Sequence, residues 1–194
     1  AKLRDKVDTL IIIPNERLLS VATEKTSLLD AFKRADEVLL QGVAGITNLI
    51  TTPGLINTDF ADVKMILTNA GTALMGTGKA KGDNRAIAAA TAAINSPLLE
   101  SSIEGARGIL LNITGPSDMG LFELNAAAEI VHAVAHQDAN IIFGTVINDE
   151  LEDEVQVTVI AAGFDRSDAG LSRSSRGDGR ADTRGEPRGS RIKE

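Results

Sequence analysis

The chain has 194 residues, of which 43% are hydrophobic, and it contains no Cys. This length and composition fit one ordinary domain, or one plus pieces of another, with a sizeable core, and the lack of Cys excludes disulfides and thiol catalysis. Residues 1–165 hold twelve basic against twenty-two acidic side chains, and the chain has no Tyr or Trp. A nucleic-acid partner, which needs a basic face and stacking rings, is therefore not expected.

Two further features concern location. No run of about 18 apolar residues is present, so direct membrane insertion is not expected, and the lack of Cys fits a reducing cytoplasm. The sequence begins at Ala1 in the middle of a charged pattern that leads into a strand. It shows no signal-peptide pattern, and we expect it to be a fragment.

Residues 7–13, VDTLIII, form the first predicted element. The run is β-branched and continuous, which is typical of a strand buried on both faces of a parallel sheet. Asn15 follows Pro14 just beyond its carboxyl end, where open α/β sheets bind ligands. Asn15 is therefore a candidate ligand contact, although Asn after Pro also fits an ordinary turn.

A long helix is predicted next, capped by Thr26 or Ser27 and running to about Thr51, before Pro53 and Gly54. Its apolar residues recur at helical spacing, and others widen the stripe, so we expect burial on more than one side and a role as a spine between two domains. The stripe consists of Leu28, Phe32, Ala35, Leu39, Val43, Ile46 and Ile50.

Phe32 and Asp36 lie one helical turn apart and share a face of this helix. A flat ring can stack on a purine, and a carboxylate can accept hydrogen bonds from the N1 and N2 donors of guanine. The alternative from spacing alone is that Phe32 belongs to the core and Asp36 is a solvated helix charge.

Residues 54–64, GLINTDFADVK, contain a loop that leads into another helix. Asp59 and Asp62 stand three apart, and Asn57 precedes them, so the three polar groups cluster at one exposed end if Thr58 or Asp59 caps the helix. Acidic residues in a first turn also commonly offset the helix macrodipole, which is the simpler interpretation.

The remaining elements predict a compact α/β unit with a mixed four-stranded sheet. Residues 72–76 are expected to be a strand followed by a glycine-rich turn, which lacks the Gly and Ser/Thr spacing of a phosphate loop. His132 and His136 have a zinc-compatible spacing without a third ligand, so no metal site is predicted. The other predicted elements are a helix at 61–69, a helix at 85–95 capped by Asp83 or Asn84, strands at 109–113, 141–147 and 155–161, and a helix at 121–136.

From about residue 166 the sequence is dominated by Arg, Gly, Ser and Asp, with eight basic and five acidic side chains. Such a segment has too little apolar surface to offset the entropy of folding. We expect a disordered linker or tail over 166–194.

Over residues 1–165 the sequence resembles the FtsZ family, the tubulin-like GTPases of bacterial cell division. The resemblance rests on VDTLIIIPNERLL, AFKRADEVL, GITNLITTPGLINTDFADVK, ALMGTG, INSPLLE, GILLNITG and NIIFGTVINDEL. It implies the end of a Rossmann-like GTPase domain at 1–27, a central helix at 28–53 and a C-terminal α/β domain with a mixed four-stranded sheet at 54–165.

The resemblance also implies roles. Phe32 and Asp36 match positions that contact guanine, and Asn57, Asp59 and Asp62 match the loop that enters the nucleotide site of the next subunit and completes GTP hydrolysis there. The implied ligands are GTP or GDP with Mg²⁺, and the implied partners are further copies in a head-to-tail protofilament at the mid-cell division ring. Division-ring and membrane-tether proteins would bind through the tail of the full-length protein.

The family's GGGTGTG phosphate-binding signature and its ribose-binding Glu and Arg are absent from this sequence. The short apolar tail peptide is not evident either. The chain alone is therefore expected to bind GTP weakly or not at all and to be inactive, with GTPase activity belonging to the intact polymer. Two alternatives are a non-catalytic module that caps filaments and, with little support, a freestanding two-carboxylate metal hydrolase.

Overall fold

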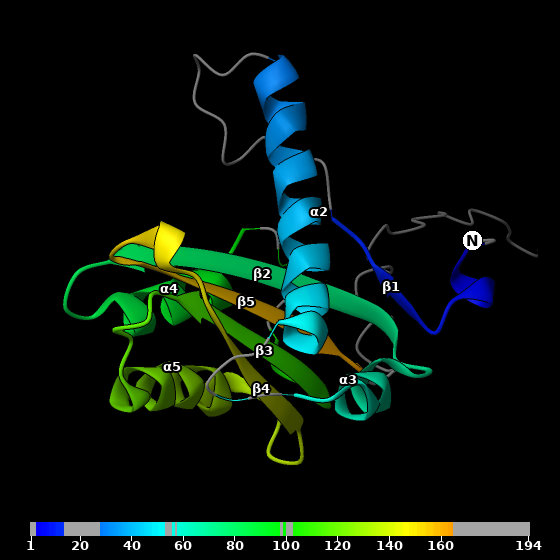
Figure 1. Cartoon of the computed structure of the whole chain (residues 1–194). Helices are drawn as coiled ribbons and strands as arrows, with labels where there is room; N and C mark the ends of the chain where they lie inside the picture. Colours follow the sequence, from blue (N-terminus) through cyan, green and yellow to red (C-terminus); the bar gives the residue numbers. More distant parts are fainter. Residues whose placement is uncertain are drawn as a thin grey trace, which may run out of the picture.

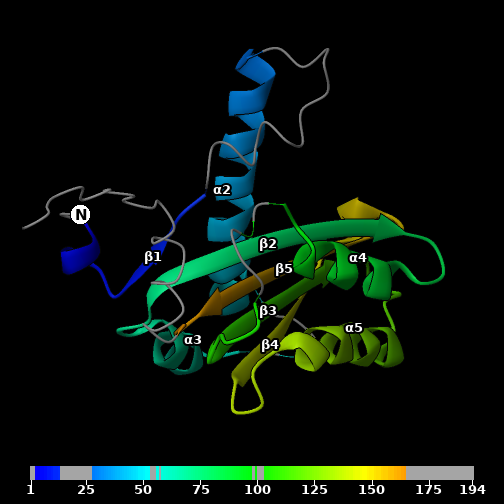
Figure 2. The ribbon, with the colours of Figure 1, turned by 180° about the vertical axis from the view of Figure 1, so that it is seen from behind.

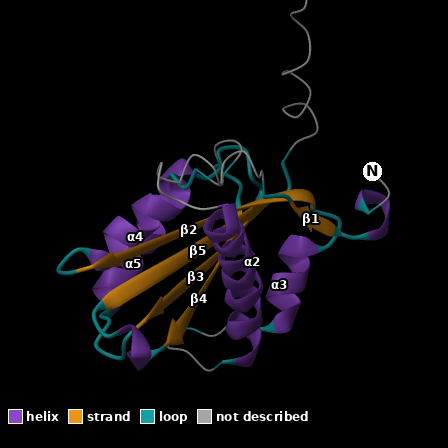
Figure 3. Ribbon diagram, turned by 90° about the horizontal axis from the view of Figure 1, so that it is seen from above, coloured by secondary structure: helices purple, strands orange, loops and turns teal. Residues whose placement is uncertain are grey.

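The computed structural model describes residues 3–13, 28–52, 56, 58–97, 99 and 103–164. They form three layers: a central sheet, helices α4 and α5 on one face, and helices α2 and α3 on the other (Figure 3). The predicted tail at 166–194 lies outside the described residues. Within those residues, no helix has both the length and the apolar character needed to cross a bilayer.

The sheet has five strands in the order β1-β2-β5-β3-β4. β5 pairs antiparallel with both β2 and β3, while β3 and β4 are parallel and are joined through α5 (Figure 1). The bounds are β1 Thr9–Ile11, β2 Gly71–Lys81, β3 Gly108–Gly115, β4 Asn140–Ile147 and β5 Glu154–Ala162; the helices are α2 Leu28–Thr51, α3 Phe60–Leu67, α4 Arg85–Ile94 and α5 Leu121–Val134, with 3₁₀ turns η1 Arg4–Lys6 and η2 Asp149–Leu151.

The α/β class and the mixed sheet are confirmed, but the predicted strand number is wrong by one. The first strand does not belong to a separate sheet, because Thr9 and Ile11 pair in parallel with Gly71 and Ala73 of β2. It is also only three residues long and half-buried, with Ile12 exposed beyond it. A continuous apolar run therefore marks an edge strand here, and not one buried on both faces as predicted.

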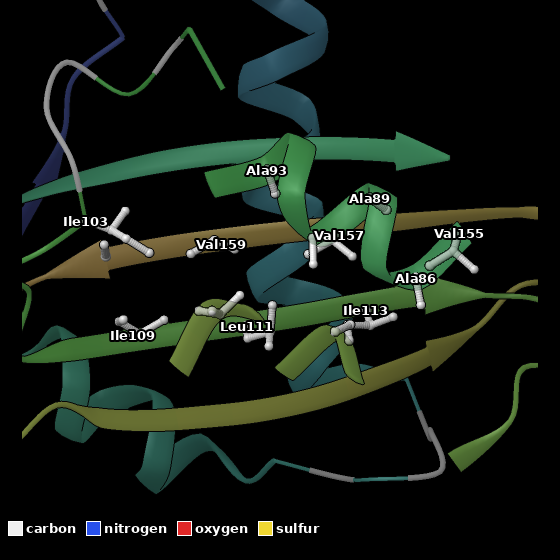
Figure 4. Close-up of a cluster of buried hydrophobic side chains, with 14 of the residues drawn as sticks. Ala86, Ala89, Ala93, Ile103, Ile109, Leu111, Ile113, Val155, Val157 and Val159 are labelled. Atoms are coloured by element: carbon white, nitrogen blue, oxygen red, sulfur yellow. The ribbon is translucent and has the colours of Figure 1, made fainter. Parts of the chain in front are cut away.

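The larger core lies between the sheet and the α4–α5 pair. Alternate residues of β3 and β5 point into it, as expected from the two-residue period of a strand, and they meet small side chains of α4 such as Ala86, Ala89 and Ala93 (Figure 4). The strand side of this core includes Ile109, Leu111, Ile113, Val155, Val157 and Val159, each almost fully buried.

β2 corrects the predicted glycine-rich turn. Residues 71–81 form one continuous strand, and Gly76 and Gly78 lie in its middle. An added Cβ at Gly76 would collide with the Ala93 carbonyl oxygen, and one at Gly78 with the Ala89 carbonyl oxygen. The two glycines therefore let the backbone of α4 approach β2 closely, which is a common reason for Gly inside a strand.

The long helix α2 is confirmed, but its predicted burial is wrong. Leu39, Leu40 and Val43 are more than half exposed, and the N-terminal half of α2 projects away from the sheet (Figures 1 and 2). The face of α2 that contacts the sheet contains three buried residues, Gly42, Gly45 and Leu49. Added Cβ atoms at the two glycines would press on Met75 and Thr158, so close backbone approach selects this face over the more apolar one.

The elements around the domain follow the prediction closely. α3, α4, β3, α5, β4 and β5 start and end within about two residues of their expected limits. α5 buries Leu124, Ala127 and Val131, while Ala128 and Ala135 are half-buried. Asn84 occupies the N-cap position of α4 without a side-chain capping bond.

Arg85 joins two turns and the first turn of α5 at one end of the sheet. Its guanidinium is nearly buried and bonds Asp118 at 2.7 Å, Asp153 at 2.8 Å and Glu123 at 3.3 Å. The hydrogen bond that Arg85 donates to the Asp118 carboxylate raises the pKa of Arg85, so the group stays charged. A cation in the first turn of a helix opposes the macrodipole, and the three carboxylates offset that cost.

We expect Gly78→Ala to lower the free energy of unfolding by about 1–3 kcal/mol, because the new methyl group cannot avoid the α4 backbone. The measurement is urea unfolding followed by circular dichroism. Thr77→Val is the matched control, since Thr77 is the neighbouring residue on the opposite face of β2 and should change stability by less than about 0.5 kcal/mol. Equal midpoints for the two variants would contradict the close packing.

Arg85→Met should cost about 1–3 kcal/mol, since it leaves the partly buried Glu123 carboxylate without its cation. Arg85→Lys should recover only part of this loss, because one ammonium cannot reproduce the guanidinium fork. Lys79→Met is the control: it removes only the exposed pair with Glu37 at 3.9 Å, worth less than about 1 kcal/mol. Equal stability of Arg85→Met and Lys79→Met in thermal unfolding would show that the ion pairs of Arg85 do not stabilise the fold.

Candidate functional site

The loop that leads into α3 is fixed to the edge of the sheet by backbone and hydroxyl groups. The Ile56 N–H donates to Thr145 Oγ1 at 2.9 Å, and the Thr145 N–H donates to the Ile56 carbonyl at 3.1 Å. Thr58 is buried, and its hydroxyl donates to the Phe143 carbonyl at 3.1 Å. The loop thus runs along β4 and satisfies groups that an edge strand would otherwise leave to solvent.

Gly144 makes this arrangement possible. An added Cβ at Gly144 would collide with the side chain of Leu49 and lie 2.9 Å from Thr58 Oγ1. Leu49 belongs to the last turns of α2, so the end of the long helix, the loop and β4 meet at one residue without a side chain. This contact sets where the loop lies relative to both α2 and the sheet.

Of the two candidate caps, Thr58 and Asp59, it is Asp59 that caps α3. Its Oδ1 accepts the Asp62 N–H at 2.9 Å, and the Val63 N–H bonds its carbonyl at 3.4 Å. Asp59 is exposed and Asp62 half-buried in the first turn. The two carboxylates therefore lie together on the surface at the start of α3, and Asn57, predicted to join them, lies outside the described residues.

No basic side chain in the described part of the chain forms an ion pair with Asp59 or Asp62. The same residues contain no group of three or more metal-ligating side chains. Two carboxylates alone fit the usual protein contribution to Mg²⁺, which takes one or two of them and completes its shell with water and substrate phosphates. The two carboxylates could therefore share a Mg²⁺ ion with a phosphate-bearing ligand.

Phe32 and Asp36 lie on the projecting half of α2. Both are exposed, Phe32 by 57%, so neither belongs to the core. From Asp36 to the end of α2 the helix rises by about 22 Å, and α3, whose N-cap and first turn carry Asp59 and Asp62, lies beyond that end (Figure 1). The two predicted sets of residues therefore stand at opposite ends of α2. Asn15 lies outside the described residues.

Sequence reasoning missed the residues that position the loop. Gly144 and Thr145 stand inside an otherwise apolar run, IIFGTVI. A glycine there indicates close approach of another backbone or side chain, and that signal was available. The pairing of Ile56 with Thr145 had no local signal, because 89 residues separate them.

Comparison with known proteins agrees with the fold. Residues 71–165 match the family model for the C-terminal domain of the FtsZ family. An empty FtsZ dimer from M. jannaschii superimposes with a TM-score of 0.79 at 42% identity, covering 83% of this chain and 47% of that one. A second FtsZ structure from the same organism gives the same score and identity.

More distant structures share the fold alone. The type III plasmid segregation protein TubZ has 15% identity and a TM-score of 0.62, covering 80% of this chain and 44% of its own. A GTPγS-bound protofilament of CetZ2 from Haloferax volcanii has 14% identity and a TM-score of 0.65. The match covers 84% of this chain and 48% of the CetZ2 chain. The chain spans about half the length of these structures. It belongs to the FtsZ family, whose C-terminal domain it carries.

Proposed function

We propose that this chain is part of a filament-forming, GTP-hydrolysing cell-division protein, in which residues 54–64 complete the GTPase site of the adjacent subunit. The observation that carries the proposal is the separation of the two candidate half-sites by the length of α2. Phe32 and Asp36 lie near one end, and Asp59 and Asp62 lie beyond the other.

This separation excludes a single nucleotide contacted by both sets within one chain. From Asp36 to the end of α2 is about 22 Å, and the acidic loop lies further on. A second chain placed head to tail brings the loop of one subunit to the guanine contacts of the next. Repeating such a heterologous contact builds an open filament.

Each half-site has a defined chemical task. Phe32 stacks on the base, and Asp36 accepts hydrogen bonds from guanine N1 and N2. Asp59 and Asp62, with Asn57, would hold Mg²⁺ and orient the attacking water, and positioning of this kind supplies much of phosphoryl-transfer catalysis. When bound, Mg²⁺ neutralises phosphate charge. Asn15 would make a further contact with the nucleotide.

The known structures support self-association, because one related FtsZ is a dimer and a protein of the same fold forms a protofilament. In the cell, the filament would build the cytoplasmic division ring at mid-cell. The tail at 166–194 would connect it to division-ring and membrane-tether proteins. No nucleic acid takes part.

A complementation experiment tests the shared site. The nucleotide-binding half of M. jannaschii FtsZ is joined to this chain, and two variants are made: Asp36→Asn, which damages the guanine contact, and Asp62→Asn, which damages the loop. Each alone should hydrolyse GTP slowly. Mixed one to one, they should recover roughly a quarter of the normal rate per polymer, because one interface in four pairs an intact nucleotide site with an intact loop.

The rate of the mixture is compared at equal polymer mass, measured by sedimentation. A mixture no faster than the mean of its two components would mean that each chain completes its own site. Full activity of Asp62→Asn alone would remove the carboxylate from the mechanism.

Asp59→Asn separates catalysis from helix capping. Asn caps a helix about as well as Asp, so the free energy of unfolding should stay within about 0.5 kcal/mol, whereas GTP turnover in the same fusion protein should fall by roughly 10²-fold. Glu129→Gln, an exposed carboxylate on α5, is the control and should change neither. An unchanged turnover in Asp59→Asn would leave Asp59 with capping alone.

A further inference from the structure

A cleft of about 220 Å³ lies between the N-terminal turns of α4 and α5, at the end of the sheet where Arg85 is bound. Its apolar walls include Ile87 and Phe122. Phe122 is 92% exposed and its neighbour Leu121 68% exposed, so the cleft opens beside a small apolar patch. The lining residues are Asp83, Asn84, Ala86, Ile87, Phe122, Glu123 and Ala126.

The rim of the cleft is acidic. Asp83 and Glu123 line it, and Asp118 and Asp153, which share Arg85 with Glu123, have side chains 73% and 62% exposed. Arg85 supplies one positive charge to three of these carboxylates, Asp118, Glu123 and Asp153, so the four acids outnumber it. A site for a drug-sized molecule usually exceeds about 300 Å³, so this cleft fits a single aliphatic side chain with cations beside it.

One segment of this chain, outside the described residues, has that chemistry. Residues 166–194 carry eight basic and five acidic side chains, and their large apolar residues are Leu171 and Ile192. Ile192 stands between Arg191 and Lys193, whereas Leu171 has uncharged neighbours. We propose that residues 191–193 dock in the α4–α5 cleft, with Ile192 against Ile87 and Phe122 and the two cations at the acidic rim.

The segment is long enough to reach. Glu154 at the start of β5 pairs with Lys81, close to α4, and Ala162 at its end pairs with Gly108, at the opposite end of the sheet. Nine strand residues span about 30 Å. An unfolded chain of 27 residues has a root-mean-square length of about 30 Å, and tethering raises the effective concentration of the segment at the cleft.

The test is methyl NMR of the whole chain, labelled at Ile δ1. Docking places the Ile192 methyl group against the ring of Phe122, so its signal should be shifted upfield from the unfolded position. The shift should be lost in Phe122→Leu and in the double variant Arg191→Glu, Lys193→Glu. It should persist in Leu171→Ser, the matched control. Phe122 is so exposed that its substitution leaves the fold intact.

Three outcomes would overturn the proposal. The Ile192 methyl group could show the unfolded position in the unmodified chain. Its shift could survive Phe122→Leu. The shift could also arise only as protein concentration is raised, which would assign the cleft to a second copy and not to the chain's own segment.

Discussion

The position of the acidic loop depends on one constraint, the contact of the loop with the edge strand β4 at Gly144. Ile56 and Thr145 exchange two hydrogen bonds there, and Thr58 adds a third to Phe143. Because Gly144 has no side chain, Leu49 of α2 reaches the same point. The end of the long helix, the loop and the sheet therefore hold a common position. Asp59 and Asp62 follow directly in the chain, so their place on the surface is inherited from this contact.

The packing of α2 follows the same rule of small residues at close contacts. Gly42 and Gly45 face Met75 and Thr158, and the helix meets the sheet only along its C-terminal half. In the other half, Leu29, Phe32 and Leu39 are exposed. That half carries the predicted guanine contacts, so the fold separates the two candidate half-sites by holding the helix at one end. The proposal of a site shared between subunits rests on that separation.

Most elements could be predicted from the sequence, because their signals are local. The capping by Asp59 and the limits of α5 follow from residues within a turn or two. The glycines were harder to interpret, since Gly76 and Gly78 fit a turn until α4 is known to lie over them. Periodicity also chose the wrong face of α2, because it counts apolar side chains and not the space that a neighbour leaves.

The long-range features could not be predicted, because no local sequence signal specifies which distant residues will meet. The parallel pairing of β1 with β2 joins residues about 60 positions apart, and Arg85 finds its three carboxylates 33 to 68 positions away. For the candidate site, the residue types came from the pattern and from the family resemblance. Only the structure shows that Ile56, Gly144 and Thr145 hold the loop that carries these residues.

The placement of the two half-sites at opposite ends of α2 has a consequence for growth. If chains join by these ends, the two tips of any filament differ chemically. One tip presents Asp59 and Asp62 without a nucleotide to act on, and the other presents Phe32 and Asp36 with a base that no loop has yet covered. Nucleotide could then exchange freely at the second tip while it waits for hydrolysis. The proposed filament would therefore have a direction, with exchange of nucleotide confined to one tip.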